Sequence, residues 1–181
     1  PVTSSSLFRI ASMSKSFTAM AIIKLRDEGK LNLDDPASRY IPELKNLKYP
    51  TADAPEITIR HLLTHGAGFP EDNPWGDRQL ADTDKELMEF IRKQISFSNP
   101  PGVEFEYSNL GFALLGKIIT SVSGKRYQDY IREKIWLPLG MKTAEWEYGN
   151  VAADKLAHGY RWLNEKWNEE ELLHDTKDGS W

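Results

Sequence analysis

Residues 7–19 read Leu-Phe-Arg-Ile-Ala-Ser-Met-Ser-Lys-Ser-Phe-Thr-Ala and are the most informative segment of the sequence. Within it, Ser12 and Lys15 stand three residues apart at the head of an apolar-periodic segment that continues to about Glu28. On a helix this spacing places both side chains on one face, so the lysine amine lies within reach of the serine hydroxyl. The pattern is typical of a serine nucleophile and its base.

The Ser-x-x-Lys spacing is weak evidence by itself, because serine and lysine are both common in this chain and one match is expected by chance. In the alternative interpretation, Ser12 only caps a helix and Lys15 lies on a solvated face. The surrounding sequence has to decide between the two.

A Tyr-x-Asn pattern occurs twice, at residues 107–109 and at residues 148–150. The first copy follows the turn cluster 99–102 and runs directly into an apolar helical pattern from Leu110 to Ile118. A tyrosine and an amide on a turn before a helix have a fixed direction. We therefore predict Tyr107 and Asn109 as site residues, and Tyr148 as an ordinary aromatic residue of a strand or loop.

Together these residues resemble the serine β-lactamase and penicillin-binding-protein superfamily, in its class C β-lactamase, D,D-peptidase and esterase branch. The segments that carry the resemblance occur in the family's order, at residues 7–19, 29–36, 57–68, 101–109 and 136–141. The resemblance implies an α+β fold of the β-lactamase/transpeptidase type. It covers roughly residues 7 to 143.

The family's third motif, Lys-Thr-Gly or His-x-Gly, does not occur after Tyr-x-Asn, and the sequences at 158–159 and 177–179 are near misses. The strands that the family places before Ser12 are not found either. We therefore expect residues 1–181 to form a partial β-lactamase-like serine hydrolase domain. It should hold mostly the helical part of the fold, with an incomplete antiparallel sheet.

The resemblance implies acyl transfer through a covalent acyl-enzyme. Ser12 would attack an ester or amide carbonyl after Lys15 takes its proton, and Tyr107 would pass that proton to the leaving group as a phenolate or relay. Asn109 would bind the acyl amide of the substrate, and the Ser12 backbone N–H would contribute to the oxyanion hole. No metal or cofactor is needed.

The substrate predicted in this way is a small carboxylic ester, a β-lactam or a D-amino-acid peptide, and the sequence does not rank these. The alternative function is a catalytically silent penicillin-recognition or scaffold module. Retention of all four residues favours the enzyme, whereas the missing third motif favours the silent module. The resemblance slightly favours a periplasmic or secreted location, a cytoplasmic one is compatible, and oligomeric state stays open.

The composition is that of a soluble globular domain, with 40% hydrophobic and 28% charged residues among 181. A net charge of −4 argues against nucleic acid or an anionic membrane surface as the main partner, because both attract basic surfaces. The absence of cysteine excludes disulfides and thiolate metal sites. No apolar run of 18 residues suggests a membrane span.

Helical periodicity and end signals predict a largely helical chain. Thr58 and Thr83 are expected N-caps, the latter within a capping box, and Gly29 and Gly124 are expected helix stops. The helices expected from these signals span residues 12–28, 59–64, 84–95, 110–122 and 127–135. Alternation over 158–163, followed by a turn at 164–166, predicts a β-hairpin with Trp167 on its return strand.

Four of the six tryptophans follow residue 145. We expect them to cover the helical core, and an alternative is that one or two line an acyl-group pocket. The polar connection 66–82 is a candidate wall of the cleft.

His61 and His65 have the i, i+4 spacing of metal ligands, but the sequence between them lacks the glutamate of a zinc peptidase. The resemblance assigns this segment a structural role. His158 and His174 are weak candidates for a Ser-His-Asp triad, because no Gly-x-Ser-x-Gly nucleophile elbow accompanies them.

Overall fold

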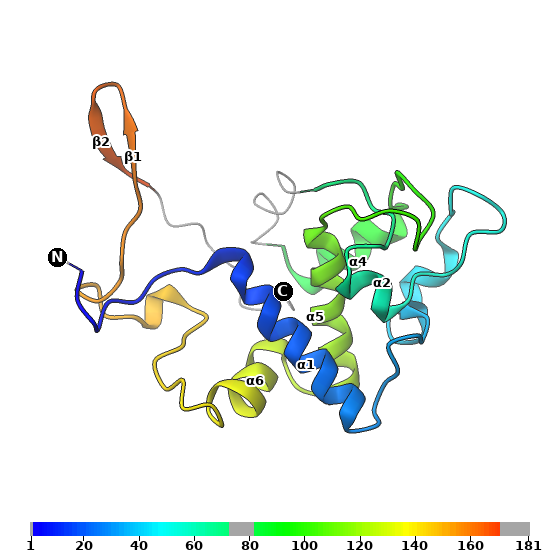
Figure 1. Cartoon of the computed structure of the whole chain (residues 1–181), viewed down its shortest axis with the longest axis horizontal. Coiled ribbons are helices and arrows are strands. Elements are labelled where there is room, and N and C mark those ends of the chain that lie inside the picture. The colour runs from blue at the N-terminus through cyan, green and yellow to red at the C-terminus, as the bar shows by residue number, and fades with distance from the viewer. Residues whose placement is uncertain (1, 73–81, 171–181) are drawn as a thin grey trace.

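The apolar run that begins at Leu110 forms the central helix of the protein. In the computed structural model, which describes residues 2–72 and 82–170, this helix is α5, Asn109–Ser123. Its buried side chains face neighbours on several sides, and α1 (Lys15–Asp27), α2 (Ile59–Leu63) and α6 (Tyr127–Ile131) pack around it (Figure 1). The predicted stop is confirmed, since Gly124 closes α5 with a left-handed φ of 69°.

Helix α1 packs against α5, and its residues Ala21, Ile22 and Leu25 are completely buried. The sequence predicts one helix from residue 12, but the α-helix begins only at Lys15. Ser12 lies in a preceding 3-10 turn, Ala11–Ser14, because Ala11 has a positive φ of 45° and the chain enters the helix through a tighter turn.

Both predicted threonine caps are confirmed. Thr58 caps α2, and Thr83 caps α4, Asp84–Arg92, in a reciprocal capping box with Glu86. Helix α4 ends before the predicted residue 95 because Gln94 adopts a positive φ of 80°. The Gln94 side chain then bonds the backbone of residues 46 and 48, which ties the end of α4 to a distant loop.

The predicted helix 127–135 is divided into α6 and a π-helical turn, Arg132–Trp136. The remaining short helical turns are of the 3-10 type, at Ala37–Arg39, Pro42–Asn46 and Tyr148–Asn150.

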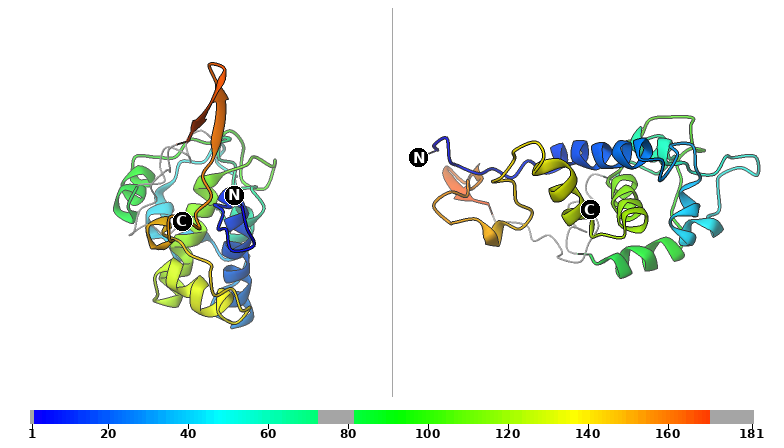
Figure 2. Two further views of the ribbon diagram at one scale, coloured as in Figure 1. Left: turned by 90° about the vertical axis from the view of Figure 1, so that its left-hand side faces the viewer. Right: turned by 90° about the horizontal axis from the view of Figure 1, so that it is seen from below.

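The predicted β-hairpin is confirmed as strands β1, Tyr160–Leu163, and β2, Lys166–Glu169, paired antiparallel with Trp162 opposite Trp167. The two turn residues, Asn164 and Glu165, both have positive φ, as a tight two-residue hairpin turn requires. The hairpin projects away from the helices in Figure 1 and in the left view of Figure 2. Helices with a small antiparallel sheet agree with the predicted α+β class.

The tryptophans of the C-terminal part divide into two groups. Trp146 covers the helical core as predicted, because its ring stacks on Trp136 with centroids 4.5 Å apart. Trp162 and Trp167 instead lie on the projecting hairpin and are 55% and 66% exposed, so the prediction is wrong for these two. Trp181 lies outside the described residues.

Candidate active site

The side chains of Ser12, Lys15, Tyr107 and Asn109 converge at one place. The Tyr107 hydroxyl donates a hydrogen bond of 2.9 Å to Ser12 Oγ, and Lys15 Nζ donates one of 3.2 Å to the same oxygen. Lys15 Nζ also donates a bond of 2.6 Å to Asn109 Oδ1. One serine oxygen is therefore within hydrogen-bond distance of an amine and a phenol.

The crossing of α1 and α5 creates this cluster. Ser12 lies in the 3-10 turn that leads into α1, and Lys15 is the first residue of that helix. Tyr107 lies just before α5, and Asn109 is the first residue of α5. Lys15 is half-buried, and its Nζ lies 5.0 Å from the centroid of the Tyr107 ring and 5.6 Å from that of Phe112. The aromatic faces stabilise the cation between them, while Ser12 remains exposed to an incoming substrate.

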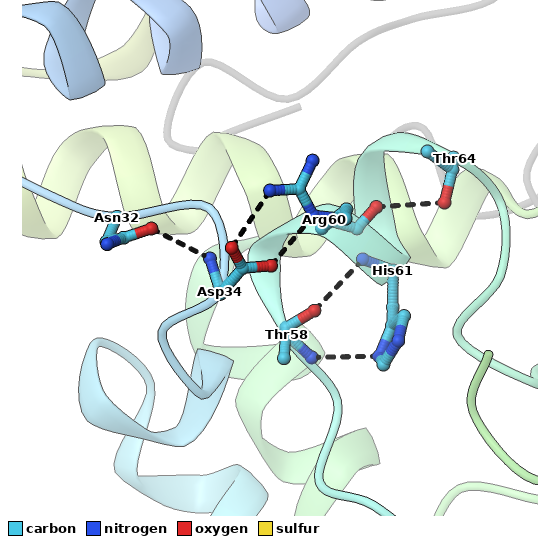
Figure 3. A network of polar contacts seen from close by, with 6 residues as sticks. All are labelled: Asn32, Asp34, Thr58, Arg60, His61 and Thr64. Atoms are coloured by element: carbon cyan, nitrogen blue, oxygen red, sulfur yellow. Dashed lines mark hydrogen bonds and ion pairs between the residues drawn. The ribbon is translucent and has the colours of Figure 1, made fainter.

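Helix α2 anchors the segment that supports this site (Figure 3). Thr58 accepts a hydrogen bond from the His61 backbone N–H, and His61 Nδ1 accepts one from the Thr58 N–H. Arg60 binds Asp34 through two bonds of 2.7 and 2.9 Å, which lower the pKa of the Asp34 carboxyl. Burial lowers the pKa of His61. His61 thus serves the helix cap.

After α2, the chain lies alongside the segment that leads to Tyr107. The carbonyl of Gly66 accepts a hydrogen bond of 2.8 Å from the Gly102 N–H, and the Gly68 carbonyl accepts one of 3.0 Å from the Ser98 N–H. Gly68 has a φ of 79°, and a Cβ there would come within 2.1 Å of the Asn99 carbonyl oxygen. Only glycine permits this close approach, which fixes the path of the Tyr107 segment.

His65 belongs to the site, although sequence analysis assigned it only a structural role. Its Nδ1 accepts a hydrogen bond of 3.0 Å from the Ser108 N–H, and its ring stacks on Tyr107 with centroids 4.7 Å apart. Burial, and then the charge of Lys15, lower the pKa of His65, although Asp72 opposes them. Its positive φ is not visible in a pattern of residue types, so no sequence signal pointed to this contact.

Asp72 is a second residue that sequence analysis missed. Its carboxylate accepts hydrogen bonds from the backbone N–H groups of Asn109 and Leu110, at 2.6 and 2.9 Å, and from the Ser108 hydroxyl at 2.9 Å. It therefore caps α5 from the connection 66–82, where its negative charge complements the helix dipole. The connection 66–82 is a predicted wall of the cleft, and residues 73–81 of this connection lie outside the described residues.

The other candidates lie elsewhere in the structure. Tyr148 stands in a 3-10 turn, whereas the sequence allowed a strand or loop. His158 bonds Glu169 of the hairpin, and the alternatives at His174 and at 177–179 lie outside the described residues.

Among the described residues, no group of three or more His, Cys, Asp or Glu side chains is suited to bind a metal ion. Across residues 2–72 and 82–170, every helix is too short or too polar to span a membrane.

Comparison with known proteins shows the family that the sequence resembles. The β-lactamase family model matches residues 1–179. "Beta-lactamase-like protein 2" of Dictyostelium discoideum is 39% identical over 165 residues, which cover 88% of this chain and 29% of that protein. The chain thus spans less than a third of this curated relative.

Solved structures of similar proteins confirm the fold. An octameric penicillin-binding protein homologue from Pyrococcus abyssi superposes with a TM-score of 0.78 and 34% identity, over 97% of this chain and 41% of that one. A class C β-lactamase superposes with a TM-score of 0.75 and 30% identity, over 99% and 47%. With its Ser12–Lys15 and Tyr107–Asn109 pairs brought together on a fold of this type, the chain belongs to the β-lactamase family of serine β-lactamases and penicillin-binding proteins.

Proposed function

We propose that this chain carries the acylation machinery of a serine hydrolase that acts on a carboxylic ester, a β-lactam or a D-amino-acid peptide. The observation that carries the proposal is the pair of hydrogen bonds, from Lys15 Nζ and from Tyr107 Oη, that meet at Ser12 Oγ. Family membership supports it, because the family's chemistry is formation and hydrolysis of an acyl-serine.

In the proposed reaction, Lys15 first gives up its own proton, and Ser12 Oγ then forms a bond to the substrate carbonyl carbon as the serine proton passes to the Lys15 amine. The carbonyl oxygen becomes an oxyanion, to which the Ser12 backbone N–H is a candidate donor. The bond to the leaving group then breaks, and the proton passes through Tyr107 to the departing nitrogen or oxygen. Water then attacks the acyl carbon, and the bond between this carbon and Ser12 Oγ breaks as a proton passes through Tyr107 from the water to Ser12 Oγ.

Asn109 has two roles in this proposal. Its Oδ1 accepts the hydrogen bond from Lys15, which orients the amine toward Ser12. Its Nδ2 group provides two donors that would bind the acyl carbonyl of an amide substrate. An amide is suited to this double task because it carries a donor and an acceptor on one rigid plane.

A catalytically silent penicillin-recognition module is the second candidate for residues 1–181 taken by themselves, because these residues hold no Lys-Thr-Gly or His-x-Gly motif. Intact-mass spectrometry after incubation with a fluorophosphonate and with a β-lactam, followed by a p-nitrophenyl ester assay, separates the two. Adducts together with ester turnover support the hydrolase. A persistent β-lactam adduct without turnover supports the recognition module. Absence of any adduct on the folded chain contradicts both.

A further inference from the structure

His65 holds the chain on both sides of Tyr107. Its backbone carbonyl accepts a hydrogen bond of 2.9 Å from the Glu106 N–H, and its Nδ1 accepts one of 3.0 Å from the Ser108 N–H. The residue between these two points, Tyr107, lies with its ring against the imidazole at an interplanar angle of 28°. Backbone and ring of Tyr107 are thus positioned by one residue.

We propose that His65 is a positioning residue that aims the Tyr107 hydroxyl at Ser12 and does so only as the neutral imidazole. The inference rests on the proposed function, because it concerns the acylation of Ser12. The Ser108 N–H is a donor, so the Nδ1 atom that receives it carries no proton, and the proton of the neutral ring lies on Nε2.

Protonation of His65 would remove this arrangement for two reasons. A proton on Nδ1 would face the Ser108 N–H, so that two donors would point at each other and the backbone bond would be lost. The imidazolium would also be a second cation beside Lys15, which approaches from α1. The Asp72 carboxylate faces His65 from the following connection and favours the charged ring, but burial and Lys15 outweigh it.

The backbone of His65 provides a matched pair of variants. Its φ is 56°, a left-handed conformation in which asparagine is among the best tolerated residues with a side chain. His65→Asn offers a carbonyl oxygen as acceptor for the Ser108 N–H, does not titrate and loses the ring stack. His65→Phe keeps the stack and loses the acceptor. His61→Asn is the control, because His61 also accepts a backbone N–H bond but at the α2 cap.

The experiment measures the second-order rate of fluorophosphonate labelling of Ser12 between pH 5 and pH 8, with the melting temperature of each variant. We expect His65→Phe to label about 10- to 100-fold more slowly at pH 8, because a small misplacement of a reacting group has costs of this size. His61→Asn should label at the wild-type rate. The ratio of the His65→Asn rate to the wild-type rate should rise as the pH falls through the pKa of His65, which burial and Lys15 hold below the ordinary histidine value of about 6.5. Ionisations common to both proteins cancel in this ratio.

Two results would overturn the inference while leaving the proposed function intact. One is wild-type labelling rates in folded His65→Phe and His65→Asn. The other is a rate ratio that stays flat across the pH range in which the ¹⁵N chemical shifts of His65 in the wild-type protein show its protonation. If both variants unfold, the ¹⁵N chemical shifts of His65 in the wild-type protein decide. A non-protonated Nδ1 at pH 7.5 supports the inference, and a protonated Nδ1 contradicts it. Failure of the wild-type protein to label at all would instead contradict the proposed function.

Discussion

The Tyr107 hydroxyl lies 2.9 Å from Ser12 Oγ, although 95 positions separate the two residues in the sequence. The contact forms because α1 packs against α5, which brings the 3-10 turn before α1 close to the segment just before α5. The Tyr107 hydroxyl, which can relay a proton, is thus hydrogen-bonded to Ser12 Oγ, the atom that we propose as the nucleophile.

Replacement of Tyr107 should slow the chemistry without unfolding the protein. Tyr107→Phe keeps the stack on His65 and removes only the hydroxyl that contacts Ser12. We expect a loss of about 10²–10⁴-fold in the rate of Ser12 acylation, the usual contribution of a positioned acid or base. Tyr148→Phe is the matched control and should label at the wild-type rate. A loss in Tyr148→Phe with none in Tyr107→Phe would reverse the choice between the two Tyr-x-Asn segments.

Lys15 should be as important as Tyr107. Lys15→Met removes the amine that bonds both Ser12 and Asn109 but keeps an unbranched chain of similar length between the aromatic rings. We expect the acylation rate to fall by about 10²–10⁴-fold. Lys24→Met, further along α1 and paired with Glu28 at the surface, should leave the rate unchanged. Normal labelling of folded Lys15→Met would show that another group accepts the serine proton.

Asp72→Ala tests the cap that the connection supplies to α5. The substitution removes the acceptor of two backbone N–H groups and should lower the free energy of unfolding by about 1–2 kcal/mol, measured by urea denaturation. Acylation should slow as well, because Asn109 is the first residue of α5. Thr83→Ala removes the cap of α4 and should destabilise comparably while labelling normally. Equal labelling rates in both variants would show that Asp72 only stabilises the helix.

The stability of the protein should fall when the pH drops below about 6.5. Burial lowers the pKa of His61 and His65 in the folded protein, whereas the unfolded chain keeps the ordinary value near 6.5. The unfolded state therefore binds more protons in this range, and the stability present above pH 6.5 is lost as the pH falls toward the folded-state values. Urea denaturation at pH 7.5 and 5.5 measures the change.

The double variant His61→Asn, His65→Asn is the control for this pH dependence. It should be less stable at pH 7.5 and should lose less stability on going to pH 5.5. An unchanged pH dependence in the double variant would assign the effect to other groups.

Sequence patterns predicted the parts of the structure that depend on neighbouring residues. Thr58, Thr83 and Gly124 act locally on helix ends, and the hairpin turn at Asn164 depends on two adjacent residues. The Ser-x-x-Lys and Tyr-x-Asn spacings likewise identified side chains that the structure brings together.

The remaining site contacts depend on the tertiary path of the chain. Asp72 reaches the start of α5 across 37 positions, and His65 reaches Ser108 across 43. A lone aspartate in a polar connection gives no sequence signal for such a contact. The start of α1 at Lys15 was also missed, because the 3-10 turn that precedes it depends on the positive φ of Ala11.

The most direct test of the proposed nucleophile is to locate the residue that a fluorophosphonate modifies, by intact mass and then by peptide mapping. One adduct per chain should form and should map to Ser12. Ser12→Ala should form none, whereas Ser14→Ala and Ser16→Ala should label normally, since Ser14 precedes α1 as its N-cap and the Ser16 hydroxyl donates to the Met13 carbonyl at 2.6 Å. Labelling that persists in folded Ser12→Ala, or that maps to another residue in the wild-type protein, would contradict the assignment of Ser12.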